Sequence, residues 1–124
     1  MRLKRSRIEI HYVRPRITEK DSEGGTYEEY DTARPFQGEV WPASGKVQAE
    51  MFGERLSYIR NVRMLGDYVI STDRKGKVHY VFPDGLDVTE SDGMCLYVSG
   101  NSNPDYKVLS IKPYRPLRLE AEKI

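Results

Sequence analysis

Short runs of β-branched and aromatic residues, each bounded by turn-forming residues, fill the second half of the chain and most constrain its fold. The runs are SYIRNVRML, DYVIS, KVHYVF, MCLYVS, YKVLSI and LRLEAEK, and they are separated by GD, DRKGK, PDG, SDG and SGNSNPD. The Gly, Asn, Asp and Pro residues of these separators favour tight turns. Short strands at this spacing predict an all-β fold, either a barrel or a sandwich.

Alternation with a period of two supports strands at both ends of the chain. In RIEIHYV it sets Ile8, Ile10 and Tyr12 against Glu9, His11 and Val13; in YKVLSIK it sets Val108, Ser110 and Lys112 against Leu109 and Ile111; in LRLEAEK it sets Leu117 and Leu119 against Arg118 and Glu120. Pro15 should stop or bend the first strand, and Gly24-Gly25 predicts a turn or hairpin tip before TYEEYD. RPFQGEVWP predicts another strand that ends at Pro42.

The stretch SGKVQAEMFG, residues 44–53, fits two kinds of structure. Val47 and Met51 occupy alternate positions of a strand pattern, yet they also lie on one face of a helix. We predict a short helix or loop, with a helix over residues 46–52 that Ser44 could cap and Gly53 could end. A helix this short needs tertiary support. SYIRNVRM should then return to the sheet.

Size, charge and cysteine content narrow the function classes. The chain has 124 residues, which predicts one domain over residues 1–124. Its 20 Lys and Arg nearly balance its 19 Asp and Glu, so the net charge of +1 gives no general attraction to nucleic acid or membranes. Cys95 is the only cysteine, which excludes an internal disulfide. The chain contains no run of about 18 apolar residues, so we expect no membrane partner.

No catalytic or metal-binding pattern is apparent. His11, His79 and Cys95 have the wrong spacing for a zinc site, and each histidine lies in a strand-like run. Cys95 is expected to be a small buried residue. Glu28 and Glu29 would point to opposite faces of a strand, which favours a solvated edge over an acid–base pair. We therefore expect no enzyme, no metal and no cofactor.

Two basic segments could contact DNA. The first is the leader, which carries Arg2, Lys4, Arg5 and Arg7 and which we otherwise expect to be a flexible, solvated terminus at residues 1–6. The second is YKVLSIKPYRPLR, where basic and aromatic residues are interleaved as in a stacking platform. A plain strand followed by a proline-bounded connection explains the second segment equally well.

The order IEIHYVRPRI, SEGGTYEEYDTARPFQGEVWPASGKVQAEMFG and YKVLSI…LRLEAEK resembles the head-closure (stopper or head–tail joining) proteins of long-tailed bacteriophages. The resemblance covers most of the chain and is less clear over residues 67–92, to which no family property is transferred. It implies a small antiparallel β-barrel with an insert at about residues 44–58 that is mobile in the isolated subunit. In assembled rings of this family, the inserts of all subunits can converge and plug the DNA channel.

The resemblance implies a structural virion protein at the head–tail interface, made in the host bacterial cytoplasm. Its partners would be further copies of itself in a ring, typically a dodecamer, a portal or helical adaptor protein, a tail-completion or tail-tube protein, and double-stranded DNA. The gating segment would comprise Ser44, Gly45, Lys46, Val47, Gln48, Ala49, Glu50, Met51, Phe52 and Gly53. Contacts to neighbouring subunits or DNA would involve Arg2, Lys4, Arg5, Arg7, Glu28 and Glu29. The alternative function is a small-barrel nucleic-acid-binding module.

Overall fold

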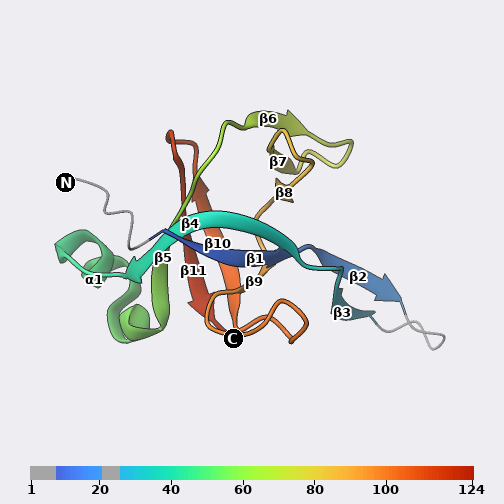
Figure 1. The fold of residues 1–124 in the computed structure, drawn as a ribbon. Coiled ribbons are helices and arrows are strands. Elements are labelled where there is room, and N and C mark those ends of the chain that lie inside the picture. The colour runs from blue at the N-terminus through green and yellow to red at the C-terminus, as the bar shows by residue number, and fades with distance from the viewer. Residues whose placement is uncertain (1–7, 21–25) are drawn as a thin grey trace.

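A closed antiparallel barrel of six strands forms the centre of the molecule (Figure 1). The structure is a computed structural model that describes residues 8–20 and 26–124. Around the barrel the strands follow the order β1-β4-β5-β11-β10-β9. Their bounds are β1 Glu9–Arg14, β4 Arg34–Pro42, β5 Ile59–Met64, β9 Gly93–Cys95, β10 Tyr106–Lys112 and β11 Leu117–Lys123. The all-β expectation, with one short α-helix, is confirmed.

Two small sheets extend from the barrel in different directions (Figure 1). One is the hairpin of β2 (Arg16–Lys20) and β3 (Thr26–Tyr30). The other contains β6 (Val69–Thr72), β7 (Val78–Val81) and β8 (Asp87–Val88), in that order. Pro15 separates β1 from β2, as expected, and β4 ends at Pro42. The Gly24-Gly25 turn and the leader at residues 1–7 lie outside the described residues.

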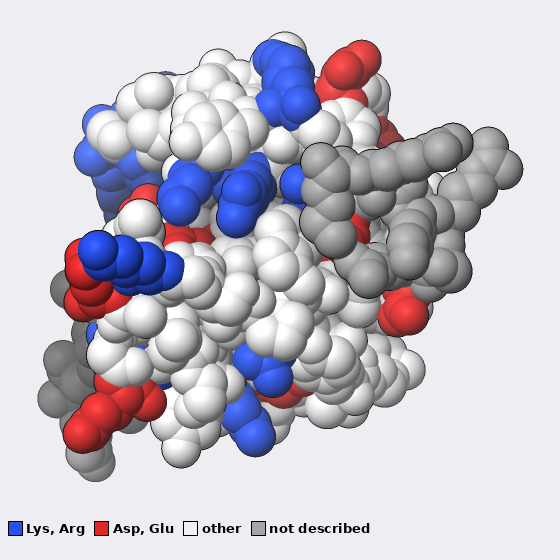
Figure 2. All heavy atoms as spheres, turned by 90° about the vertical axis from the view of Figure 1, so that its left-hand side faces the viewer, with Lys and Arg blue, Asp and Glu red and all other residues white. Residues whose placement is uncertain are grey.

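Charged side chains gather unevenly on the outside of the molecule. Figure 2 shows the side that carries the short helix, where most Lys and Arg groups lie in the upper half and Asp and Glu groups lie at the left margin and toward the right. Uncharged surface separates the basic groups. The small net charge of +1 therefore does not mean that charge is evenly spread.

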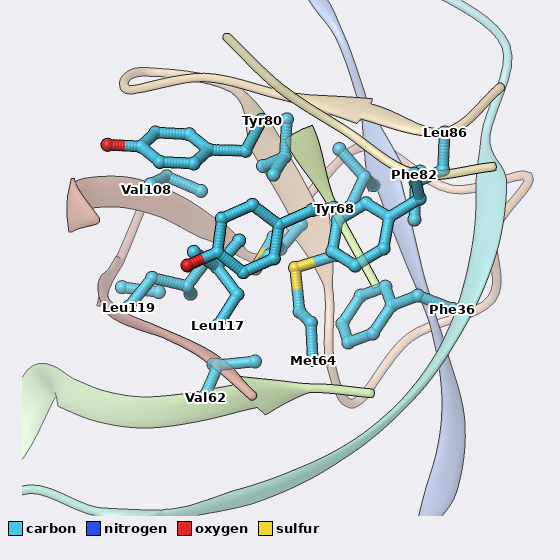
Figure 3. Packing of buried hydrophobic residues seen from close by; sticks show 14 of the residues in the cluster. Phe36, Val62, Met64, Tyr68, Tyr80, Phe82, Leu86, Val108, Leu117 and Leu119 are labelled. Carbon is cyan, nitrogen blue, oxygen red and sulfur yellow. The ribbon is translucent and has the colours of Figure 1, made fainter. Parts of the chain in front are cut away.

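The core lies inside the barrel and continues under the three-stranded sheet. Tyr68 connects the two parts, because its ring packs against Tyr80 at 5.8 Å and Phe82 at 5.9 Å between centroids. Figure 3 shows the Tyr68 and Phe82 rings close to Met64 and Phe36, with Tyr80 farther away, near Val108. The Tyr68 hydroxyl donates a hydrogen bond to the Tyr114 carbonyl at 2.8 Å. The three-stranded sheet is thus fixed to the barrel by aromatic packing.

The apolar residues of β1 suggest that the face with Ile10 and Tyr12 enters the core, but the opposite face does. His11 and Val13 are buried, whereas Ile10 is exposed. The His11 imidazole is accommodated because its Nδ1 lies 3.0 Å from the Leu96 carbonyl oxygen and its ring packs against Phe36. The strand was correctly predicted, but tertiary contacts decide which set of side chains enters the core.

Gly38 allows β4 to pack closely within the barrel wall. It pairs with Glu9 of β1 and Met64 of β5. A Cβ atom at this position would collide with the Arg63 carbonyl oxygen and come within 3.0 Å of the Phe36 ring. Since the obstructing oxygen belongs to the backbone of a neighbouring strand, a side chain here requires the wall to move.

We expect Gly38→Ala to lower the free energy of unfolding by about 1–3 kcal/mol, the usual cost of overpacking a core. Urea denaturation followed by tryptophan fluorescence would measure the change. Gln37→Ala is the matched control, because Gln37 is the preceding residue of β4 and its side chain is exposed. Equal stability of Gly38→Ala and Gln37→Ala would contradict the steric argument.

Candidate functional site

The predicted insert connects β4 to β5 as two consecutive helical segments. These are α1 (Lys46–Phe52) and a 3₁₀ helix, η2 (Gly53–Tyr58). The helix over residues 46–52 is confirmed, and Gly53 ends it with φ of 55° and an N–H that donates to the Ala49 carbonyl. Ser44 is not the cap: Gly45 occupies that position, and no side chain caps the helix. The barrel wall resumes at Ile59, so the start of SYIRNVRM still belongs to η2.

The insert lies on the outside of the barrel and contributes no fully buried side chain. No residue of α1 or η2 is buried. Val47 is 72% exposed and Met51 is 59% exposed, so the apolar pair that shares a helical face points to solvent. The apolar burial that normally stabilises a short helix is therefore small here.

Gln48 provides the main contact between α1 and the barrel. Its Nε2 donates to Asn61 Oδ1 at 2.7 Å and to Glu120 Oε2 at 2.8 Å. Its Oε1 accepts from Asn61 Nδ2 and from the Ser44 N–H, each at 3.1 Å. All the hydrogen-bonding groups of this amide are thus used. We call Gln48, Asn61, Glu120 and Ser110 the Gln48 junction.

Strand register places the three barrel residues of this junction, Asn61, Glu120 and Ser110, side by side in one row across the wall. Asn61 on β5 pairs with Glu120 on β11, which pairs with Ser110 on β10. Asn61 and Glu120 are buried, although they are on the outer side of the wall, because the insert covers them. The Ser110 hydroxyl donates to Glu120 Oε1 at 2.6 Å, and Lys112 Nζ lies 4.0 Å from Oε2.

The Glu120 carboxylate is held in its charged form. Burial by itself raises its pKa, but the hydrogen bonds from Ser110 and Gln48 and the charges of Lys112 and Arg118 outweigh burial. The net result is a pKa below the usual value for glutamate. Gln48 therefore binds a buried carboxylate, a stronger acceptor than a neutral group.

Arg55 makes a second contact between the insert and the wall. Its Nε and Nη2 donate to the two carboxylate oxygens of Glu122 at 2.7 and 2.6 Å. These bonds lower the pKa of Glu122 and raise that of Arg55. Because the pair is at the surface, salt screens it and its contribution to stability is modest.

A basic and aromatic surface adjoins the Gln48 junction. Arg63 and Arg118 both lie over the Trp41 ring, with their Cζ atoms 5.3 and 5.2 Å from its centroid. Register places Arg63 beside Arg118 and Arg118 beside Lys112 across three neighbouring strands. We call Trp41, Arg63, Arg118 and Lys112 the Trp41 surface. Glu39 lies 3.9 Å from Arg63 and offsets part of its charge.

The structure does not bring together all the residues that the sequence singled out. Arg2, Lys4, Arg5 and Arg7 lie outside the described residues. Glu28 and Glu29 are both on β3, away from the insert, and the side chain of Glu29 is exposed. Among the described residues, β3 and the 44–53 segment lie on different sides of the barrel (Figure 1).

Sequence reasoning included Gln48 but missed its partners. Asn61 and Glu120 occupy outward positions of strands, where polar residues normally face water. Glu120 lies between the apolar residues Leu119 and Ala121, but Asn61 follows the charged Arg60, so no common local pattern marks the two. Arg55 and Glu122 gave no signal, because 67 positions separate them in the sequence.

The remaining candidate residues have structural partners. Cys95 is buried, as predicted, and burial raises the pKa of its thiol. His79 lies between two carboxylates, with Nε2 3.0 Å from Asp73 and Nδ1 2.9 Å from Asp87. Among the described residues no group of three or more His, Cys, Asp or Glu side chains is arranged to hold a metal ion.

Comparisons with known proteins do not identify a family for this chain. No protein-family model matches it, and no curated protein or solved structure matches it either. Over residues 8–20 and 26–124, no helix has the length and apolar character to cross a membrane. The functional argument therefore depends on the geometry of the insert and the wall.

We expect Gln48→Ala to loosen the insert without unfolding the barrel. The substitution removes the amide that bonds Asn61 and Glu120, although Glu120 keeps Ser110, and it should lower the local opening free energy of α1 by about 1–3 kcal/mol. Hydrogen exchange would show faster exchange in α1 and unchanged exchange in β11. Glu50→Ala, an exposed position of the same helix, should leave both unchanged. Loss of protection throughout the barrel would contradict a local role.

Acid should release the insert. Glu120 and Glu122 have lowered folded-state pKa values, so each stabilises the fold above the usual glutamate pKa and loses that contribution as the pH falls through its folded value. We expect steady α1 protection above about pH 5 and a decline below about pH 4. High salt should suppress the contribution of Glu122, and Glu120→Gln should remove most of the remaining dependence. A decline near neutral pH would argue against both carboxylates.

Proposed function

We propose that this protein is a structural virion protein of a long-tailed bacteriophage. It forms a ring at the head–tail interface that extends the DNA channel, closes the filled head and docks the tail. The observation that carries the proposal is the insert: its apolar face points outward while polar contacts hold it to a closed barrel. Such an insert can exchange its hydrogen bonds with the barrel wall for contacts with another subunit, and the apolar core of the barrel stays covered.

Neighbouring copies of the chain would provide a way to bury the exposed side chains of Val47 and Met51. On a single subunit, these side chains remain in water. In a ring, inserts that leave the wall can meet around the axis and bury this apolar face against one another. The free energy gained by that burial would replace the hydrogen bonds of the Gln48 junction. A segment with two nearly balanced states is what a channel gate requires.

A position at the head–tail interface would give the ring a partner on each side. One rim of the ring would contact a portal or helical adaptor protein, and the other a tail-completion or tail-tube protein. Double-stranded DNA would occupy the channel. The protein would be made in the host cytoplasm and would function in the virion.

A second candidate function is nucleic-acid binding by the free barrel. The Trp41 surface favours it, because Arg63, Arg118 and Lys112 present three cations in a row next to an aromatic ring. This arrangement suits a phosphate backbone. Within a ring the same surface could contact channel DNA, so the two proposals differ in whether the isolated subunit binds.

Electron microscopy of the purified protein mixed with portal complex tests the first proposal. We expect an additional ring on the portal. Hydrogen exchange of Val47 to Met51 should differ between the free subunit and the ring, since the gating model changes their surroundings. Equal protection in both states would contradict gating, although it would leave ring formation intact.

Binding of the free protein to duplex DNA separates the two functions. The ring proposal predicts weak binding by the monomer. The alternative predicts binding that weakens steeply with salt, and Arg118→Gln should reduce the salt slope by about one phosphate contact. Lys123→Gln is the matched control, because Lys123 is an exposed cation of the same strand outside the Trp41 surface. Tight, salt-dependent binding together with no ring on the portal would favour the alternative.

A further inference from the structure

Strand β6 forms an open edge of the three-stranded sheet. It pairs with β7 on one side, and no strand among the described residues pairs with its other side. All four of its residues are exposed, with Val69 at 66% and Ile70 at 55%. An exposed apolar edge of this kind is a template for pairing with another chain.

The free backbone groups of this edge can be assigned from the ladder. The Asp73 N–H donates to the Lys77 carbonyl at 2.9 Å, and the Asp73 carbonyl accepts from the Gly76 N–H at 3.0 Å, so both backbone groups of Asp73 point toward the β7 side of the hairpin. Bonded and non-bonded pairs alternate along an antiparallel ladder. Counting back through the register places Thr72 and Ile70 in non-bonded pairs with β7. Their N–H and C=O groups therefore point away from the sheet.

The β2–β3 hairpin is a second incomplete sheet. Its two strands pair only with each other in the described part of the chain, and it extends from the barrel as an arm (Figure 1). Its base is firmly held. Arg14 donates to the carbonyls of Tyr30 and Asp31 at 2.9 Å each, and Asp92 Oδ1 accepts the Arg16 N–H at 3.1 Å. A two-stranded hairpin is marginally stable alone, so a third strand would stabilise it.

The turn after β6 is basic, whereas β3 and the residue that follows it carry acidic side chains. Arg74, Lys75 and Lys77 are exposed in the turn that follows β6. Asp73, in the same turn, is engaged by His79. The β3 sequence TYEEYD contains Glu28 and Glu29 and leads into Asp31. Adding β3 beside β6 would therefore bring the exposed carboxylates Glu29 and Asp31 near this basic turn.

We propose that β3 of one copy of this chain adds to the β6 edge of the next copy. The hairpin and the three-stranded sheet then form one continuous sheet across the interface. Backbone hydrogen bonds from Ile70 and Thr72 supply affinity, and the charges supply orientation. The contact uses two different surfaces, so repeated addition gives a ring where the rotation closes.

This pairing deepens the proposed function by naming the contact that would build the ring, and its biological setting rests on that function. The pairing itself can be tested on the free protein. Such a test is informative whether or not the protein assembles on a portal.

Cross-linking between two single-cysteine variants tests the pairing. We would mix Glu29→Cys with Thr72→Cys and add a short bismaleimide; buried Cys95 can stay, with the unmodified protein as control. We expect a cross-linked dimer in the mixture, none from either variant alone, and a ladder of oligomers when one chain carries both cysteines. Self-linking of Thr72→Cys would indicate β6–β6 pairing and overturn the proposal, as would a mixture that does not cross-link.

Ile70→Pro, placed in the Thr72→Cys chain, checks that the backbone mediates the contact. Proline removes the outward N–H but no bond to β7, and edge positions tolerate it. We expect about tenfold less cross-linking than with Ile70→Val, which keeps the N–H. Circular dichroism would confirm that both variants fold.

Equal cross-linking by the Ile70→Pro and Ile70→Val variants would overturn the proposal. A ring on the portal without cross-linking would refute this contact alone, whereas cross-linking without a portal ring would support the contact and count against the head–tail placement.

Discussion

Closure of the barrel through β11 is the constraint on which the rest of the structure depends. β11 pairs with β5 on one side and β10 on the other, and it sends Leu117, Leu119 and Ala121 into the core. Strand periodicity then sends Arg118, Glu120 and Glu122 outward. Arg118 belongs to the Trp41 surface, Glu120 belongs to the Gln48 junction, and Glu122 binds Arg55 of the insert. The inward residues that stabilise the barrel therefore also position the residues that hold the insert.

Much of the fold could be predicted because its signals are local. Runs of β-branched and aromatic residues between Gly, Asp and Pro turns identified most strands, and Pro42 marked the end of β4. The helix over residues 46–52 was predicted from good helix formers followed by Gly53. The two-residue β8 was missed, since so short a strand has no period to detect.

What could not be predicted depends on contacts between distant segments. His11 is buried in place of Ile10 because a carbonyl from the β9 side of the barrel receives it. In β10, strict alternation was wrong: the register shifts between Val108 and Ser110, so Val108 and Ile111 both pack on the core. The candidate site also depends on contacts between distant segments. Asn61 and Glu120 are buried only because the insert lies over two neighbouring strands of the wall.

The barrel and its insert are stabilised by different kinds of interaction. A neutral hydrogen bond of the Gln48 junction contributes about 1 kcal/mol net and one to the Glu120 carboxylate about 1.5–3 kcal/mol. The surface pair Arg55–Glu122 is screened by salt and adds little. Truncating one buried leucine, such as Leu119, costs about 2–5 kcal/mol. Opening the insert therefore breaks polar contacts and leaves the apolar core of the barrel packed. Release would leave Glu120 charged, and water entering the vacated surface could solvate it. A buried apolar contact in place of Gln48 would make that release more costly, which gives a physical reason for a polar junction beneath an insert that we propose to act as a gate.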